Sequence, residues 1–227
     1  FLFDDKTGEF WFLEVNTRLQ VEHPVTEEVT DMDLVYEQLR IARGEELGYE
    51  QYDISWSGHS IEARLYAEDP DNDFLPETGT LIAFEEDYEA EARWDSGVES
   101  GSIVGTSFDP MLAKVISYGA TRTDAAIKLA RALEAAHIGG LTTNRDFLVA
   151  TLKTQEFLDG DTTTDFIERV KPPRALILSE EQLDHVTAIA ALWIQELNRL
   201  HDDVLGHLPS GWTNGRTPKQ NIKFKYK

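Results

Sequence analysis

The chain has 227 residues, of which 41% are hydrophobic and 10% aromatic, enough to bury one sizeable core and to begin a second. Its 42 acidic residues outnumber 21 basic ones, for a formal charge of −21, so the chain would repel phosphate backbones and we expect no nucleic-acid partner. It contains no cysteine, which excludes disulfides and cysteine-bound zinc, and its apolar runs are too short for a membrane span, so we expect no membrane partner.

The first elements in chain order form a predicted hairpin. Residues 1–3 are typical of the end of a strand, residues 4–8 of a turn, and residues 9–15 of a returning strand rich in aromatic and aliphatic side chains. We therefore expect the chain to begin in the middle of a fold.

Polar side chains recur at every second position along the returning segment. We call them the polar ladder: Glu14, Asn16, Arg18, Gln20 and Glu22. In an extended segment the ladder would line one surface, with the apolar residues Leu13, Val15, Leu19 and Val21 packed behind it. The alternative is the solvated face of an ordinary strand, but amides are not favoured in strands.

The ladder has the chemistry to hold both a cation and an anion. Glu14 and Asn16 offer hard oxygen ligands of the kind that Mg²⁺ accepts beside nucleotide phosphates. Arg18 offers a rigid fork of donors that suits a carboxylate or bicarbonate. Phosphoryl transfer onto a small acid needs both functions close together.

A helix and a strand follow the ladder. The helical spacing of residues 34–41, after possible caps at Asp31 and Asp33, predicts a helix that ends near Gly44 and backs the sheet of the site. The alternation of residues 60–66 predicts a strand with Ile61, Ala63 and Leu65 on one face and Glu62, Arg64 and Tyr66 on the other. A salt bridge from Arg64 to Glu62 or Glu68 is the simpler reading of that arginine.

The rest of the chain predicts short strands, helices and one boundary. Glycines separate strands through Tyr118, Thr123 caps a helix that Gly139-Gly140 ends, and helices cover residues 144–158 and 161–170. Pro172-Pro173 marks a domain boundary. Ser179 and Gln182 form a capping box that opens a long helix with an apolar seam from Val186 to Val204, and residues 221–227 alternate as a strand.

Several motifs carry a family resemblance. Residues 12–19, FLEVNTRL, resemble the second signature of carbamoyl-phosphate-synthase-type ATP-grasp enzymes, and residues 20–27, QVEHPVTE, resemble the biotin carboxylase branch. Residues 58–70 (GHSIEARLYAEDP), 74–76 (FLP), 108–114 (FDPMLAK) and 142–144 (TTN) extend the resemblance in the same order. It spans about residues 1–171.

The resemblance implies an α+β fold in three parts. Residues 1–44 would be the end of an ATP-grasp domain, and residues 45–171 a biotin carboxylase C-terminal domain with a mixed or antiparallel sheet and flanking helices. Residues 172–227 look like a linker, a long helix and the first strand of the β-rich connecting domain of an acyl-CoA carboxylase alpha subunit. The family's glycine-rich phosphate loop would precede Phe1, so we expect the chain alone to be inactive.

The resemblance also implies an activity, which is the carboxylation of biotin on a carrier with MgATP and bicarbonate as the first half-reaction of an acyl-CoA carboxylase. Glu14 would bind ATP and, with Asn16, the Mg²⁺ or Mn²⁺ ion. Arg18, Gln20 and the backbone of Val21 would hold bicarbonate.

Two further residues have roles by resemblance. Glu22 would be the general base that deprotonates bicarbonate, and Arg64 would stabilise the oxyanion of biotin. The implied partners are a biotin carboxyl carrier region, a carboxyltransferase beta subunit and a second copy of the chain, with Arg93 and Trp94 as candidate dimer contacts. A cytoplasmic location is expected. The alternatives are another ATP-grasp ligase, of the pyruvate carboxylase or carbamoyl-phosphate synthase type, and a non-catalytic binding or assembly module.

Overall fold

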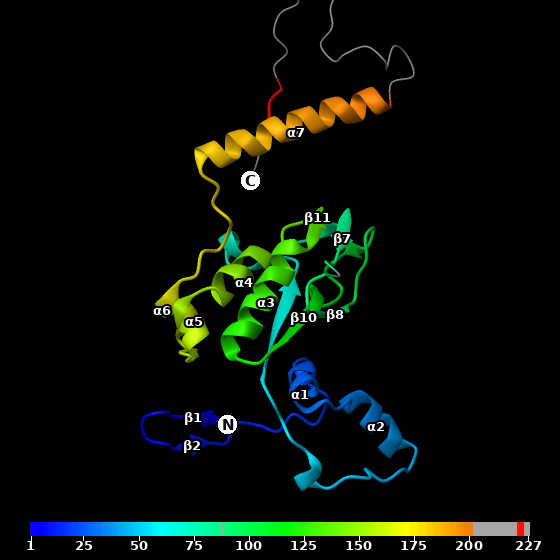
Figure 1. Cartoon of the computed structure of the whole chain (residues 1–227), viewed down its shortest axis with the longest axis vertical. Helices are drawn as coiled ribbons and strands as arrows, with labels where there is room; N and C mark the ends of the chain where they lie inside the picture. Colours follow the sequence, from blue (N-terminus) through cyan, green and yellow to red (C-terminus); the bar gives the residue numbers. More distant parts are fainter. Residues whose placement is uncertain (88, 202–221, 225–227) are drawn as a thin grey trace, which may run out of the picture. The chain divides into compact units, whose positions relative to one another are not determined.

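The structure is a computed structural model that describes residues 1–87, 89–201 and 222–224, in two compact units, Phe1–Ala175 and Leu176–Lys227 (Figure 1). The first unit mixes helices with small antiparallel sheets, which confirms the predicted α+β class. Among the described residues, no helix combines the length and the apolar character that a membrane crossing requires.

A three-stranded antiparallel sheet forms the centre of the first unit. Its order is β3 (His59–Tyr66), β10 (Met111–Gly119) and β8 (Arg93–Ser96). Lys114 on β10 lies opposite Arg64 on β3 and opposite Asp95 on β8. The register thus places three charged residues in one row across the sheet.

The two faces of this sheet differ in chemistry. Ala63, Val115 and the buried side of α3 (Arg122–Ala135) share one hydrophobic cluster, which α4 (Arg145–Leu152) completes. Because strand residues alternate, the charged row faces the other side, where α1 (His23–Thr30) packs against β3 and β10. The predicted alternation of β3 is confirmed, with Ala63 and Leu65 buried and Arg64 exposed.

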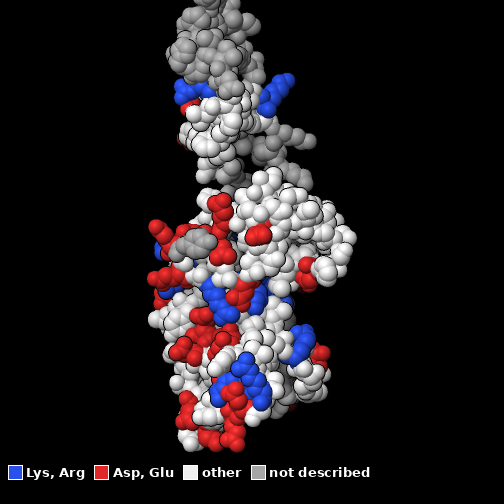
Figure 2. Space-filling model, turned by 90° about the vertical axis from the view of Figure 1, so that its right-hand side faces the viewer, with Lys and Arg blue, Asp and Glu red and all other residues white. Residues whose placement is uncertain are grey.

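Short elements complete the first unit. Four two-stranded antiparallel pairs join β1 (Leu2–Phe3) to β2 (Phe10–Trp11), β4 (Glu68–Asp69) to β5 (Leu75–Pro76), β6 (Gly79–Thr80) to β9 (Ile103–Val104), and β7 (Ala83–Glu85) to β11 (His137–Gly139). Two 3₁₀ turns cover Gln51–Asp53 and Pro70–Asn72. On the face shown in Figure 2, acidic and basic side chains lie beside one another.

Several predicted helix ends are wrong. The cap of α3 is Thr121, not Thr123, because its hydroxyl and the Asp124 carboxylate form a reciprocal capping box, and α3 ends at Ala135 before β11 instead of at Gly139-Gly140. The helix predicted over residues 144–158 is α4 followed by α5 (Gln155–Asp159), since Thr154 starts a new helix as its N-cap. The last helix, α6 (Phe166–Val170), is shorter than predicted.

The N-terminal segment also departs from the prediction. Strand β2 stops at Trp11, and Leu13 and Val15, predicted to pack behind the ladder, are 58% and 71% exposed. A two-stranded hairpin has no second layer to cover such side chains. Helix α2 (Leu34–Ala42) begins at the predicted cap Asp33, but α1, which the sequence analysis missed, is the helix that packs on the sheet.

The second unit contains α7 (Glu180–Leu200), which opens with the predicted capping box of Ser179 and Gln182. Much of its predicted apolar seam is exposed, including Val186, Trp193 and Leu200. Val204 lies outside the described residues, as does most of the strand predicted over residues 221–227, of which only 222–224 are described.

Candidate active site

Four of the five residues of the polar ladder line a hollow, and the ladder does not form a strand. Residues 12–17 run as irregular chain after β2, and Val21 and Glu22 form a turn that leads into α1. Asn16, Arg18, Gln20 and Glu22 nevertheless line a single hollow of about 370 Å³, together with Leu19, His23, Thr26, Leu34 and Gln38. Glu14 lies outside this lining, and its Oε1 accepts a 3.5 Å hydrogen bond from Asn16 Nδ2. The predicted extended backbone is wrong, but four of the five ladder residues do meet.

The turn at Glu22 explains this geometry. Glu22 has φ −82° and ψ 9°, which is not extended, and occupies the N-cap of α1 without a side-chain capping bond. Pro24 in the first turn presets φ for the helix and lacks an N–H that the helix would leave unpaired there. The Glu22 carboxylate is thereby left to face the sheet.

Arg64 reaches Glu22 from β3. Arg64 Nη2 donates a hydrogen bond of 2.8 Å to Glu22 Oε2 across 42 residues of sequence. The ion pair with Glu62 that was weighed in the sequence is present but longer, with 4.0 Å between Glu62 Oε1 and Arg64 Nε, so the closer partner of Arg64 is Glu22. The structure therefore joins the predicted base and the predicted oxyanion-binding cation.

Buried Asn144 fixes the strand that carries Arg64. Its Nδ2 donates to the Arg64 carbonyl at 3.1 Å, and its Oδ1 accepts from the Tyr66 backbone N–H at 2.9 Å. The amide thus replaces a neighbouring strand for both backbone groups. Asn144 ends the TTN motif, but the motif alone predicted no role for this residue.

Glu62 is a feature that the sequence analysis missed. Its side chain is 4% exposed, and both carboxylate oxygens are buried without a hydrogen-bond partner among the described residues. Burial raises the pKa of Glu62, and the positive charges of Lys114 and Arg64 oppose that rise. Alternation placed Glu62 on the Arg64 face but could not show that α1 would cover it.

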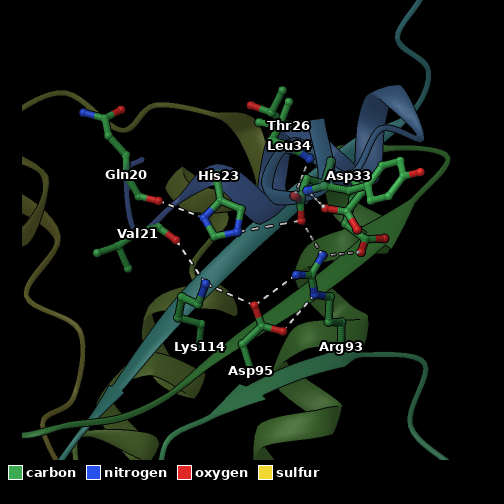
Figure 3. A network of polar contacts seen from close by, with 12 residues as sticks. Gln20, Val21, His23, Thr26, Asp33, Leu34, Arg93, Asp95 and Lys114 are labelled. Carbon is green, nitrogen blue, oxygen red and sulfur yellow. Dashed lines mark hydrogen bonds and ion pairs between the residues drawn. The ribbon is translucent and has the colours of Figure 1, made fainter. Parts of the chain in front are cut away.

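A closed circuit of polar contacts holds the backbone beside Glu22 (Figure 3). We call it the charge ring, and its members are Gln20, Val21, His23, Glu27, Arg93, Asp95 and Lys114. On one side, Lys114 Nζ donates to the Val21 carbonyl at 3.4 Å and pairs with Asp95 at 3.1 Å. Lys114 therefore ties the predicted bicarbonate loop to the sheet.

The other side of the ring runs through α1. The Gln20 carbonyl lies 2.8 Å from His23 Nδ1, and His23 Nε2 lies 3.9 Å from the buried carboxylate of Glu27. Glu27 Oε2 accepts from Arg93 at 2.8 Å, and Glu27 Oε1 accepts from the Leu34 backbone N–H at 2.9 Å. Both carbonyls of residues 20 and 21 are thus anchored.

The ring charges stabilise one another. Burial alone would raise the pKa of Asp95, but hydrogen bonds from Arg93 and Lys114 outweigh burial and hold this pKa below its ordinary value. The same bond to Asp95, with a second bond that Arg93 donates to Glu27, raises the pKa of Arg93. Arg93 and Asp95 come from β8, and only the tertiary fold brings Arg93 to α1 and Asp95 to Lys114.

The candidate dimer contacts Arg93 and Trp94 point to opposite faces. Arg93 belongs to the ring, with its side chain 36% exposed. Trp94 packs edge-to-face against Phe84, with 6.2 Å between ring centroids, and contacts both hydrophobic clusters. Trp94 is partly buried against the core, and its role as a dimer contact stays a prediction.

The metal-binding chemistry of this chain is partial. Glu14 and Asn16 lie side by side and offer oxygen atoms, but the described residues contain no group of three or more acidic, histidine or cysteine side chains that could hold an ion by themselves. Mg²⁺ usually takes one or two carboxylates and completes its shell with phosphates and water. The pair therefore fits a nucleotide-bound ion.

Comparisons with known proteins identify the family. The biotin carboxylase C-terminal domain matches residues 62–169, and the ATP-binding domain of the carbamoyl-phosphate synthase L chain matches residues 1–50. Biotin carboxylase 2 of Bacillus subtilis is 48% identical over 165 residues, which cover 73% of this chain and 37% of that protein.

Two carboxylase alpha chains match over a longer stretch. The human mitochondrial propionyl-CoA carboxylase alpha chain is 42% identical and covers 84% of this chain, and the Arabidopsis thaliana methylcrotonoyl-CoA carboxylase subunit alpha is 37% identical and covers 93%. This chain spans 27% and 30% of their lengths.

Solved structures agree. The biotin carboxylase domain dimer of Hydrogenobacter thermophilus 2-oxoglutarate carboxylase, solved with MgADP and bicarbonate, superposes with a TM-score of 0.71 at 38% identity, over 74% of this chain and 37% of that one. The biotin carboxylase subunit of pyruvate carboxylase gives 0.70 at 36% identity, over 74% and 37%. With matches to both successive domains, the chain belongs to the biotin carboxylase family.

Proposed function

We propose that this chain forms the C-terminal half of the catalytic region of a biotin carboxylase, which carboxylates biotin on a carrier with MgATP and bicarbonate. The observation that carries the proposal is the 2.8 Å contact between Glu22 and Arg64, since it joins a carboxylate that lines the hollow to a guanidinium from the second matched domain. Bicarbonate activation needs a base, and biotin activation needs a cation at its carbonyl oxygen.

The residues around the hollow take separate roles in this proposal. Arg18 and Gln20 bind bicarbonate with the backbone of Val21, whose carbonyl Lys114 holds in place. Glu22 accepts the proton of bicarbonate. Arg64 stabilises the negative charge that develops on the biotin ureido oxygen.

Glu14 and Asn16 would hold the Mg²⁺ or Mn²⁺ ion of the nucleotide, with Glu14 also at the ATP site. The contact between their side chains, in which Asn16 Nδ2 donates to Glu14 Oε1 at 3.5 Å, keeps the two residues together and supports this role. The ion would neutralise charge on the phosphates during transfer. A solved relative that was crystallised with MgADP and bicarbonate supports this pairing of ligands.

The partners are proposals as well. We propose an acyl-CoA carboxylase because the human propionyl-CoA carboxylase alpha chain and the Arabidopsis thaliana methylcrotonoyl-CoA carboxylase subunit alpha match 84% and 93% of this chain, whereas biotin carboxylase 2 matches 73%. A biotin carboxyl carrier, a carboxyltransferase beta subunit and a second carboxylase copy would then assemble with it. The cytoplasmic location stays a prediction, since the relatives include mitochondrial proteins.

The proposed parts of the chain are residues 1–44, 45–171 and 172–227, as predicted from the sequence. The two family matches, over residues 1–50 and 62–169, support the first division. The compact unit that begins at Leu176 supports the second.

A graft tests the base assignment. Residues 1–169 would replace the matching segment of Bacillus subtilis biotin carboxylase 2, and bicarbonate-dependent ATP cleavage with free biotin would be measured. We expect an active graft that loses at least about 100-fold in kcat on Glu22→Gln, because a positioned base contributes on that order. The control is Glu134→Gln, which removes a surface partner of Lys153. Undiminished cleavage in Glu22→Gln would reject Glu22 as the base.

A further inference from the structure

Glu62 is a buried carboxylate that has no role in the proposed mechanism. Its side chain is 4% exposed, and both oxygens are buried with no hydrogen-bond partner among the described residues. Burying a carboxylate without such partners is costly, so groups of this kind are candidates for a functional role. The side chain also lies next to the Glu22–Arg64 pair.

The charged groups that face Glu62 come from three elements. They are Arg64 on β3, Lys114 on β10, and Glu22 and His23 where α1 begins. Lys114 is already bound to Asp95 at 3.1 Å and to the Val21 carbonyl at 3.4 Å. Arg64 Nε, by contrast, lies 4.0 Å from Glu62 Oε1, just beyond a hydrogen bond.

Arg64 is bound to the carboxylate of Glu22, which must act as the base. Its Nη2 donates to Glu22 Oε2 at 2.8 Å, and a bound cation makes a carboxylate a weaker proton acceptor. The guanidinium carries five N–H donors, so it can exchange one carboxylate for another by a small rotation. Reaching a hydrogen bond with Glu62 from 4.0 Å needs a shift of about 1 Å.

We propose that Glu62 is a positioning residue that serves as the second acceptor for Arg64, to which the guanidinium turns when Glu22 is released to take a proton from bicarbonate. This inference rests on the proposed role of Glu22. It explains why a carboxylate with no hydrogen-bond partner among the described residues is buried two residues before Arg64 on the same face of β3. The ion pair seen in the structure is then the resting state of the site.

The protonation of Glu62 reports where Arg64 lies. Burial raises the pKa of Glu62, and a closer approach of Arg64 would lower it. We would titrate the Glu62 carboxyl carbon by NMR in the whole chain, with Glu62→Gln to assign the signal. Glu22 is 50% exposed and makes no capping bond, so Glu22→Gln is expected to fold.

The expected result is a fall of at least one unit in the pKa of Glu62 on Glu22→Gln, because Arg64 then turns to Glu62. Removing the negative charge of Glu22 would by itself lower this pKa somewhat, so the matched control repeats Glu22→Gln in an Arg64→Gln background. There the fall should be much smaller. Equal falls in the two backgrounds would overturn the proposal.

A double-mutant cycle gives a second measurement that does not depend on the NMR signal. Urea unfolding gives the coupling between Arg64→Gln and Glu62→Gln as a factor in the unfolding equilibrium constant. We expect this factor to be at least tenfold larger in the Glu22→Gln background than in the parent chain. Unchanged coupling would contradict the second-acceptor role. If Glu62 only stabilised one fixed arrangement of the fold, its coupling to Arg64 would not depend on Glu22.

Activity separates this inference from the proposed function. In the grafted enzyme, Glu62→Gln should lower kcat and move the acidic limb of the pH–rate profile to lower pH, because Arg64 stays on Glu22, while Glu62→Asp restores part of kcat. If Glu22→Gln leaves the graft active, the proposed function fails while the titration still decides whether Arg64 moves. If Glu22→Gln inactivates the graft but Glu62→Gln changes neither kcat nor the profile, only the inference fails.

Discussion

The central sheet and the N-terminal segment contribute to one site in different ways. Arg64, Lys114 and Asp95 stand in one row across three strands, with a buried hydrophobic cluster behind them. Residues 1–20 form a short hairpin and irregular chain, with Phe10, Leu13 and Val15 more than half exposed. The sheet thus presents preformed charges, whereas the segment that carries Glu14, Asn16 and Arg18 has little packing of its own to hold it.

The largest expected effect tests this difference in packing. Leu65→Ala on β3 removes a fully buried side chain and should lower the free energy of unfolding by about 2–5 kcal/mol. The matched control, Leu13→Ala, removes the same atoms from a site that is 58% exposed and should cost within about 0.5 kcal/mol. Urea unfolding of the chain measures both. Similar losses would mean that the two regions are packed alike.

The next effect concerns the strand end that carries Arg64. Asn144→Ala leaves the Arg64 carbonyl and the Tyr66 N–H without their partner and should cost about 1–3 kcal/mol for each group that stays buried. Asn144→Asp keeps the acceptor for Tyr66 but loses the donor, so it should cost less. An unchanged unfolding midpoint in Asn144→Ala would show that water replaces the amide.

A change in the N-terminal segment should act on chemistry instead of on stability. Arg18→Lys removes the forked donor pair but keeps the charge, so we expect bicarbonate activation in the graft to fall at least tenfold, which is about 1.4 kcal/mol. Its unfolding midpoint should match that of the parent. An unchanged rate would reject the bicarbonate role of Arg18.

The pH dependence of the ring gives a smaller effect. The folded-state pKa of Asp95 lies below its unfolded value of about 3.9, so its ionised form stabilises the fold above that pH, and this contribution is lost as the pH falls through the folded value. Asp95→Asn should therefore cost about 1 kcal/mol at pH 7, with the difference from the parent shrinking below about pH 4. Unfolding curves from pH 7 to pH 3 measure it; a constant difference would contradict the pairing.

Part of this structure was predictable from local pattern. The alternation of β3 and the caps of α2 and α7 depend on neighbouring residues, so their positions follow from sequence. Helix α1 was missed because its eight residues are too few for a clear apolar period, although Pro24 in its first turn was a usable signal.

The polar ladder residues were predicted to lie together, but on the basis of a backbone conformation that they do not adopt. Alternation placed Asn16, Arg18 and Glu22 together on a strand face, but a turn at Val21 and Glu22 brings them to the hollow. The burial of Glu62 and the contact of Arg93 with Glu27 were beyond local pattern, because α1 and β8 meet only after the chain has folded over 66 residues of sequence.

The charge ring restricts which substitutions this scaffold can accept. Around it the signs alternate, from Lys114 through Asp95 and Arg93 to Glu27, so replacing one member leaves its neighbours facing an unbalanced charge. Natural or engineered variants should therefore change adjacent members in compensating pairs. The backbone carbonyls of residues 20 and 21 would then keep their orientation while the surrounding residues change.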